Sequence, residues 1–147
     1  MGSAMRNPKL PVRIVRQGDI LRATSSIDSL YESGQNIRHK LDYIECDYRA
    51  LVKILRELYS TAKSAQRFDP RIVWLIGDYV ISFFSRLDAL GFYLVNQNET
   101  IAHDISISKS SMQRILSFRK RFSSISFVDP SIPLSRYRDK KVPLKWT

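Results

Sequence analysis

The sequence has very few of the residues from which disulfides, metal sites and catalytic triads are made. Its 147 residues include one cysteine and two histidines. The single cysteine, Cys46, excludes an internal disulfide framework and a zinc site built on several cysteines. It lies between Glu45 and Asp47, whose negative charges disfavour a thiolate nucleophile. With His39 and His103 as the only histidines, we expect no metal, no cofactor and no enzymatic activity.

Glycine and proline are also scarce, with five and six residues. The prolines leave residues 12–69 and 71–129 uninterrupted, and apolar residues recur there in alternating steps of three and four. This spacing predicts helices over residues 19–33, 36–66, 70–96 and 99–124. Asp69 before Pro70 is a typical start signal for the third of them. We therefore expect an all-α fold, an antiparallel (up-down) four-helix bundle over residues 19–124.

The most apolar run, Ile72–Val95, is long enough to suggest a membrane span, but charged residues interrupt it. Asp78, Arg86 and Asp88 would each be costly in hydrocarbon, so we interpret the run as a buried helix of a soluble protein. A carboxylate in so apolar a helix is also a setting for acid–base chemistry. We favour ion pairing instead, with Arg71 near Asp78 and Arg86 near Asp88. Among the apolar positions, Ile44, Phe83 and Leu87 should lie in the core.

Charge is concentrated at the two ends of the chain. The formal net charge is +10, yet residues 23–108 hold nine basic and eleven acidic side chains. Residues 109–147 hold ten basic and two acidic ones. We therefore expect two basic, extended arms, residues 1–18 and residues 125–147, flanking the bundle. Residues 1–5 resemble the remnant of an expression tag and are left out of the fold prediction.

The C-terminal region is the predicted docking site, because its basic residues alternate with aromatic ones. The predicted docking residues are Arg119, Lys120, Arg121, Arg136, Tyr137, Arg138, Lys140, Lys141, Lys145 and Trp146. Such a pattern requires an acidic partner, which could be nucleic acid, an anionic membrane or an acidic protein surface. We also expect that truncation after Asp129 weakens association while leaving stability almost unchanged.

Two stretches of the chain resemble helices of the PsbQ-like proteins. Ile-Arg-His-Lys-Leu-Asp-Tyr-Ile-Glu-Cys-Asp-Tyr-Arg, over residues 37–49, is similar to the second-helix signature of that family. Phe-Phe-Ser-Arg-Leu-Asp-Ala-Leu, over residues 83–90, resembles the Phe-then-Leu-Asp stretch of its third helix. Two shorter stretches, Asp-Ile-Leu at residues 19–21 and Ile-Asp at residues 27–28, fall near the place in the sequence where the first helix of that family carries similar residues. The resemblance covers residues 19–118.

The resemblance implies a non-enzymatic, basic, extrinsic subunit of a photosynthetic membrane complex. PsbQ-like proteins are four-helix proteins of the chloroplast thylakoid lumen. Some help photosystem II to retain calcium and chloride, and others belong to the chloroplast NADH-dehydrogenase-like complex. The expected partner is the acidic lumenal surface of a multi-subunit membrane complex, with the protein peripheral to the membrane. The alternative is a cytoplasmic, basic helical module that binds nucleic acid, such as a small helical subunit of an RNA-guided defence complex.

Overall fold

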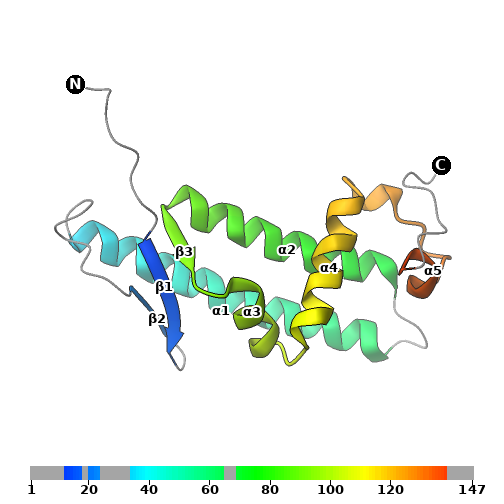
Figure 1. Cartoon of the computed structure of the whole chain (residues 1–147), viewed down its shortest axis with the longest axis horizontal. Coiled ribbons are helices and arrows are strands. Elements are labelled where there is room, and N and C mark those ends of the chain that lie inside the picture. Colours follow the sequence, from blue (N-terminus) through cyan, green and yellow to red (C-terminus); the bar gives the residue numbers. More distant parts are fainter. Residues whose placement is uncertain (1–11, 18–19, 24–33, 65–68, 139–147) are drawn as a thin grey trace, which may run out of the picture.

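The computed structural model describes the backbone of residues 12–17, 20–23, 34–64 and 69–138, and the side chains of residues 39–63 and 69–137 (Figure 1). These residues are mostly helical, which confirms the all-α prediction at that level. In chain order the elements are β1 (Val12–Gln17), β2 (Ile20–Ala23), α1 (Gly34–Ser64), α2 (Pro70–Ala89), β3 (Phe92–Leu94), α3 (Gln97–Asp104), α4 (Lys109–Arg121), the 3₁₀ turn η1 (Ile125–Phe127) and α5 (Leu134–Arg138).

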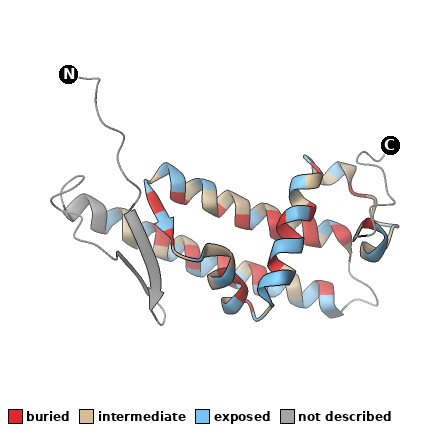
Figure 2. Ribbon diagram, viewed as in Figure 1, coloured by how far each residue is buried: buried red, intermediate tan, exposed pale blue. Residues whose placement is uncertain are grey.

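The two longest helices, α1 and α2, pack against each other in opposite directions (Figure 1). Tyr48 of α1 meets Phe83 of α2 with ring centroids 5.5 Å apart. The residues expected in the core are buried, since Ile44 and Phe83 are 0% exposed and Leu87 is 2% exposed. Figure 2 shows buried residues recurring along both helices. The spacing of three and four therefore identified the packed faces of these helices correctly.

Helix α2 begins where the sequence predicts and ends earlier. The side chain of Asp69 accepts a hydrogen bond of 2.9 Å from the backbone N–H of Arg71, and Pro70 occupies the first helical position. The helix stops at Ala89 instead of residue 96. Gly91 follows with φ of +77°, a left-handed conformation that glycine adopts at little cost, and the chain turns into β3.

A three-stranded sheet in the order β2-β1-β3 packs beside the helices (Figure 1). β1 is antiparallel to β2 and parallel to β3. The predicted helix over residues 19–33 is therefore wrong for residues 20–23, and residues 24–33 lie outside the described part of the chain. In β3, Phe92 and Leu94 are buried and the residue between them is exposed, which is strand alternation. Leu94, seven residues after Leu87, would also face inward in the predicted helix over residues 70–96, so its burial does not distinguish a helix from a strand.

The helix predicted over residues 99–124 is two helices. Helix α3 ends at Asp104, Ser106 has a positive φ of 63°, and Ser108 caps α4 by accepting a 3.0 Å hydrogen bond from the backbone N–H of Ser111. A left-handed residue cannot continue a helix, which explains the break. The apolar residues that recur over this range are buried nonetheless: Ile101, Ile105, Met112, Ile115 and Phe122.

Both predicted arms contain parts of the fold. β1 lies within residues 1–18, and its Val12 pairs with Phe92 of β3. Residues 125–147 are not simply extended, because they form η1 and α5. Tyr137 of α5 is only 1% exposed. The burial of Tyr137 argues against the expectation that truncation after Asp129 leaves stability almost unchanged, because this truncation removes a core residue.

Candidate docking surface

Helix α4 is the most basic element of the described chain. It carries five basic residues and no acidic one: Lys109, Arg114, Arg119, Lys120 and Arg121. Three of the five lie in its last turn, where positive charge is favoured by the partial negative charge of the helix end. Lys109, Arg114 and Lys120 are exposed, and their side chains form no hydrogen bond or ion pair with any other residue that the structure describes. Lys109 and Lys120 lie about 20° apart around the helix axis, and we call these two residues the basic face, whereas Arg114 lies more than about 100° away from them.

Arg119 was predicted to be a docking residue, but its side chain contacts α2 within the fold. Its Nε donates a 2.9 Å hydrogen bond to Asp78 Oδ1 on α2, and its guanidinium carbon lies 4.5 Å from the ring centre of Trp74. Arg119 and the indole N–H of Trp74 both donate to the backbone carbonyl of Phe122. Asp78 is thus paired with Arg119 instead of the expected Arg71. This contact fixes α4 against α2.

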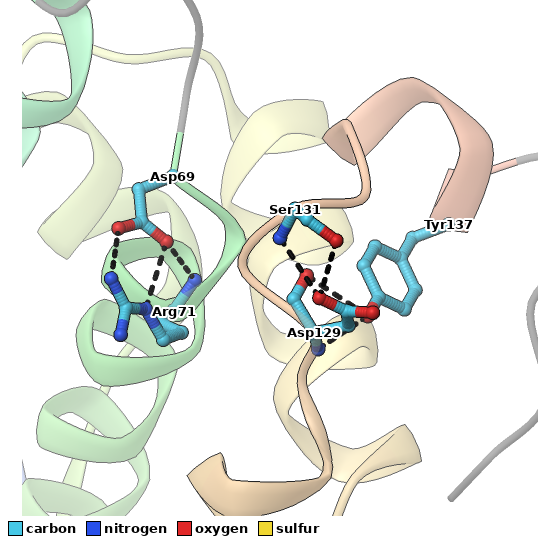
Figure 3. Close-up of polar contacts among 5 residues, drawn as sticks. All are labelled: Asp69, Arg71, Asp129, Ser131 and Tyr137. Atoms are coloured by element: carbon cyan, nitrogen blue, oxygen red, sulfur yellow. Dashed lines mark hydrogen bonds and ion pairs between the residues drawn. The ribbon is translucent and has the colours of Figure 1, made fainter. Parts of the chain in front are cut away.

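Tyr137 was predicted to be a docking residue, but it is a core residue. Its ring packs edge-on against Phe118 and Phe122, at 5.3 and 5.4 Å between centroids. Its hydroxyl accepts a 2.7 Å hydrogen bond from the backbone N–H of Asp129, and burial of the ring raises the pKa of Tyr137. Figure 3 shows the Tyr137 hydroxyl at the turn formed by Asp129 and Ser131. The same view also shows the hydrogen bonds between Asp69 and Arg71 at the start of α2.

The other predicted docking residues divide into three groups. Arg121 is partly buried, and its Nη1 donates a 2.7 Å hydrogen bond to the backbone carbonyl of Tyr137. Lys120 and Arg136 are exposed and remain open to a partner. The side chain of Arg138 lies outside the described part of the chain, as do the complete residues Lys140, Lys141, Lys145 and Trp146.

A groove runs beside α4. It is lined by α4, by the first turns of α2, by α5 and by Tyr59 of α1. Its volume is about 920 Å³. Val73, Ile115 and Phe118 form part of its apolar floor, and Arg114 and Arg121 are among its polar residues. Arg114 is not among the docking residues predicted from the sequence, and no groove was predicted at this place. One pattern in the sequence could have indicated this polar side of the groove. Polar residues recur at positions 110, 113, 114, 117 and 121, which share one face of a helix.

Outside α4, the polar contacts hold the helices together. Arg86 of α2 bonds to Asp47 of α1, not to the expected Asp88, and this hydrogen bond raises the pKa of Arg86. Tyr48 donates a hydrogen bond to the carboxylate of Asp104, which joins α1 to α3. Among the described residues there is no group of three His, Cys, Asp or Glu side chains placed to hold a metal ion.

None of the described helices combines the length and the apolar character that a membrane span requires. No family model, curated protein or solved structure matches the chain. The resemblance to PsbQ-like proteins therefore rests on its residues alone. The fold brings the two main stretches of that resemblance together, because residues 37–49 lie on α1, residues 83–89 lie on α2, and Tyr48 contacts Phe83.

Proposed function

We propose that this protein is a non-catalytic docking subunit that binds an acidic surface of a larger assembly. The observation that carries the proposal is the basic face of α4. It exposes Lys109 and Lys120 on a helix that has no acidic residue, and Arg114 adds a third exposed positive charge on another side of that helix. Exposed charges of one sign add little to the stability of the folded chain, but together they attract and orient a partner of opposite charge.

We further propose that the assembly is a photosynthetic membrane complex and that the protein is peripheral to it on the lumenal side. The resemblance to PsbQ-like proteins supports this choice. Its two main stretches form the contact between α1 and α2, at Tyr48 and Phe83 and at Asp47 and Arg86. Of the up-down bundle, the structure describes one antiparallel helix pair, α1 and α2.

The arrangement of the aromatic residues favours a protein partner over nucleic acid. Single-stranded nucleic-acid binders stack bases on accessible aromatic rings. Among the described residues, four rings near the basic residues of α4 are buried: Trp74 is 7% exposed, Phe118 9%, Phe122 0% and Tyr137 1%. Tyr59, which lines the groove with Arg114 and Arg121, is half-buried. The exposed tyrosines among the described residues, Tyr43, Tyr79 and Tyr93, belong to α1, α2 and β3. Basic residues whose described neighbouring rings are mostly buried suit an acidic protein surface better than a strand of nucleic acid.

A binding experiment with two matched double variants tests the proposal. Lys109→Glu/Lys120→Glu reverses two exposed charges on α4, and Lys53→Glu/Lys63→Glu makes the same change on α1. Each protein is bound to thylakoid membranes at low and high salt, and to a labelled single-stranded RNA. We expect saturable membrane binding that high salt releases, weakened about tenfold by the α4 variant and much less by the α1 variant.

Two outcomes would contradict the proposal. Equal loss in both double variants would mean that total charge, and not the α4 face, drives association. RNA binding that falls steeply and log-linearly with salt, without retention on membranes, would support the nucleic-acid alternative.

A further inference from the structure

The groove beside α4 has the size and composition of a peptide-binding site. Its volume of about 920 Å³ is in the range of ligand-binding clefts. We propose that it binds an acidic amphipathic segment of the partner protein, about three helical turns long. This inference rests on the proposed docking function and specifies the chemistry of the partner's anchoring segment and where that segment lies.

The floor of the groove is apolar and firmly packed. Val73 and Ile76 of α2 and Ile115 and Phe118 of α4 line it, and each is at most 9% exposed. Tyr137 also lines the groove, with its ring set edge-on against Phe118. Tyr59 of α1, which is half-buried, lines the groove as well. The rings of Phe118 and Tyr137 are held by their neighbours in the core, so these two rings offer an apolar surface and no free face for stacking a base. Aliphatic or aromatic side chains of a peptide fit such a floor.

The wall contributed by α4 is polar and positively charged. Arg114 and Arg121 line the groove together with Ser110, Gln113 and Ser117, and none of the described lining residues is acidic. Arg114 is exposed and forms no ion pair with another described residue. An occupant with carboxylates along one side would therefore meet complementary charge, while the hydroxyl and amide groups offer hydrogen bonds to its polar atoms.

The spacing of these groups suits a helix. Arg114 and Arg121 are seven residues apart on α4, which is two turns or about 10 Å along the axis. The lining residues of α4 extend from Ser110 to Arg121, about 16 Å, the length of three helical turns. A helix lying alongside α4 repeats its faces at the same interval. Carboxylates seven residues apart on that helix would face the two arginines, and apolar residues between them would face the floor.

Selection from a peptide display library tests this proposal with the full chain. The library holds random peptides of about 14 residues, and the immobilised protein selects binders from it. We expect enrichment of sequences with acidic residues about seven apart and apolar residues at helical spacing between them. The affinity of one selected peptide is then measured for the wild type and for two variants, Arg114→Glu and Lys120→Glu.

The two variants are matched, since both reverse one exposed charge on α4 and only Arg114 lines the groove. We expect Arg114→Glu to weaken peptide binding at least about tenfold, as for an anchor residue, and Lys120→Glu to weaken it less than about threefold. Arg114→Gln, which removes the charge without reversing it, provides a second measurement if Arg114→Glu does not fold by circular dichroism. It should lose part of the affinity.

The outcomes separate the groove from the docking function. Equal loss in the Arg114→Glu and Lys120→Glu variants would overturn the groove proposal while leaving the basic face of α4 as the docking surface. Failure to enrich acidic amphipathic peptides would also overturn it. Oligouridylate and dodecanoate are the competing probes. If either binds with Arg114-dependent affinity and the selected peptide does not, the groove takes a nucleic acid or a small anionic amphiphile instead.

Discussion

Replacing Gly77 with alanine tests the closest approach between α2 and α4. Gly77 is buried in α2 where α4 passes over it. A Cβ at this position would lie 2.6 Å from Arg119 Cβ and 3.1 Å from the backbone carbonyl oxygen of Ile115. Non-bonded carbon atoms prefer separations of about 3.5–4.0 Å, so α4 would have to move by about 1 Å.

Two effects of opposite sign decide the outcome. Alanine is favoured over glycine in a helix interior by about 1 kcal/mol. Overpacking a close contact costs about 1–3 kcal/mol. The atom that the new methyl group meets is a Cβ, held by the backbone of α4, so it cannot rotate away and the cost lies at the upper end. We therefore expect Gly77→Ala to lower the free energy of unfolding by roughly 1–2 kcal/mol.

Thermal and urea denaturation followed by circular dichroism measure this change. The expected loss corresponds to a fall in Tm of roughly 2–8 °C for a chain of this size. Ser85→Ala, at an exposed position of the same helix, is the matched control and should be neutral or slightly stabilising. In the double variant Gly77→Ala/Arg119→Gly the clashing Cβ is absent, so the two single losses should not add.

The sign of the change decides between the two explanations. A gain of about 1 kcal/mol in Gly77→Ala is what helix propensity alone predicts. That gain would mean that α4 does not approach α2 this closely. Strict additivity in the double variant would refute the contact between Gly77 and Arg119 in the same way.

Three further changes probe the core and the C-terminal segment. Phe83→Ala should lower the free energy of unfolding by about 3–5 kcal/mol, because the ring is fully buried; a loss below about 0.5 kcal/mol in urea denaturation would contradict its place in the core. Truncation after Asp129 removes Tyr137 and should cost about as much, so an unchanged Tm would show that α5 does not pack on the helices. Tyr137→Phe should cost about 1 kcal/mol near neutral pH, through the lost hydrogen bond to Asp129. The raised pKa of Tyr137 means that the folded state holds the proton more tightly than the unfolded chain, so wild-type stability falls as the pH rises above about 10. The difference between the two proteins should therefore shrink there in urea titrations, and a constant difference would contradict the burial of the hydroxyl.

Local signals in the sequence predicted much of the helical structure. The start of α2 follows from two adjacent residues. The side chain of Asp69 accepts a hydrogen bond from a backbone N–H of the first turn, and Pro70 has a backbone φ that already suits a helix. Neither effect needs the rest of the chain. The buried positions of α1 and α2, such as Ile44 and Phe83, follow from spacing alone. A helix exposes the same face every three or four residues, whatever covers that face.

The ends of the helices were less predictable, because several signals there agree with more than one structure. Leu94 fits both the last turn of a helix and an inward position of a strand, and the glycine at position 91 decides between them only through its positive φ. The strand β2 at residues 20–23 depends on pairing with β1. Its short apolar run fits a helix equally well until the partner strand is known.

The sequence by itself determined which residues are basic, where apolar faces recur and where α2 begins. Only the tertiary structure decided what each of these residues does. Arg119 contacts the interior of the fold because Asp78 and Trp74, more than forty positions earlier in the chain, face it from α2. Arg114, five residues before it on the same helix, faces a groove. Composition and spacing give the chemistry of a side chain, whereas its neighbours come from segments that meet only when the chain folds.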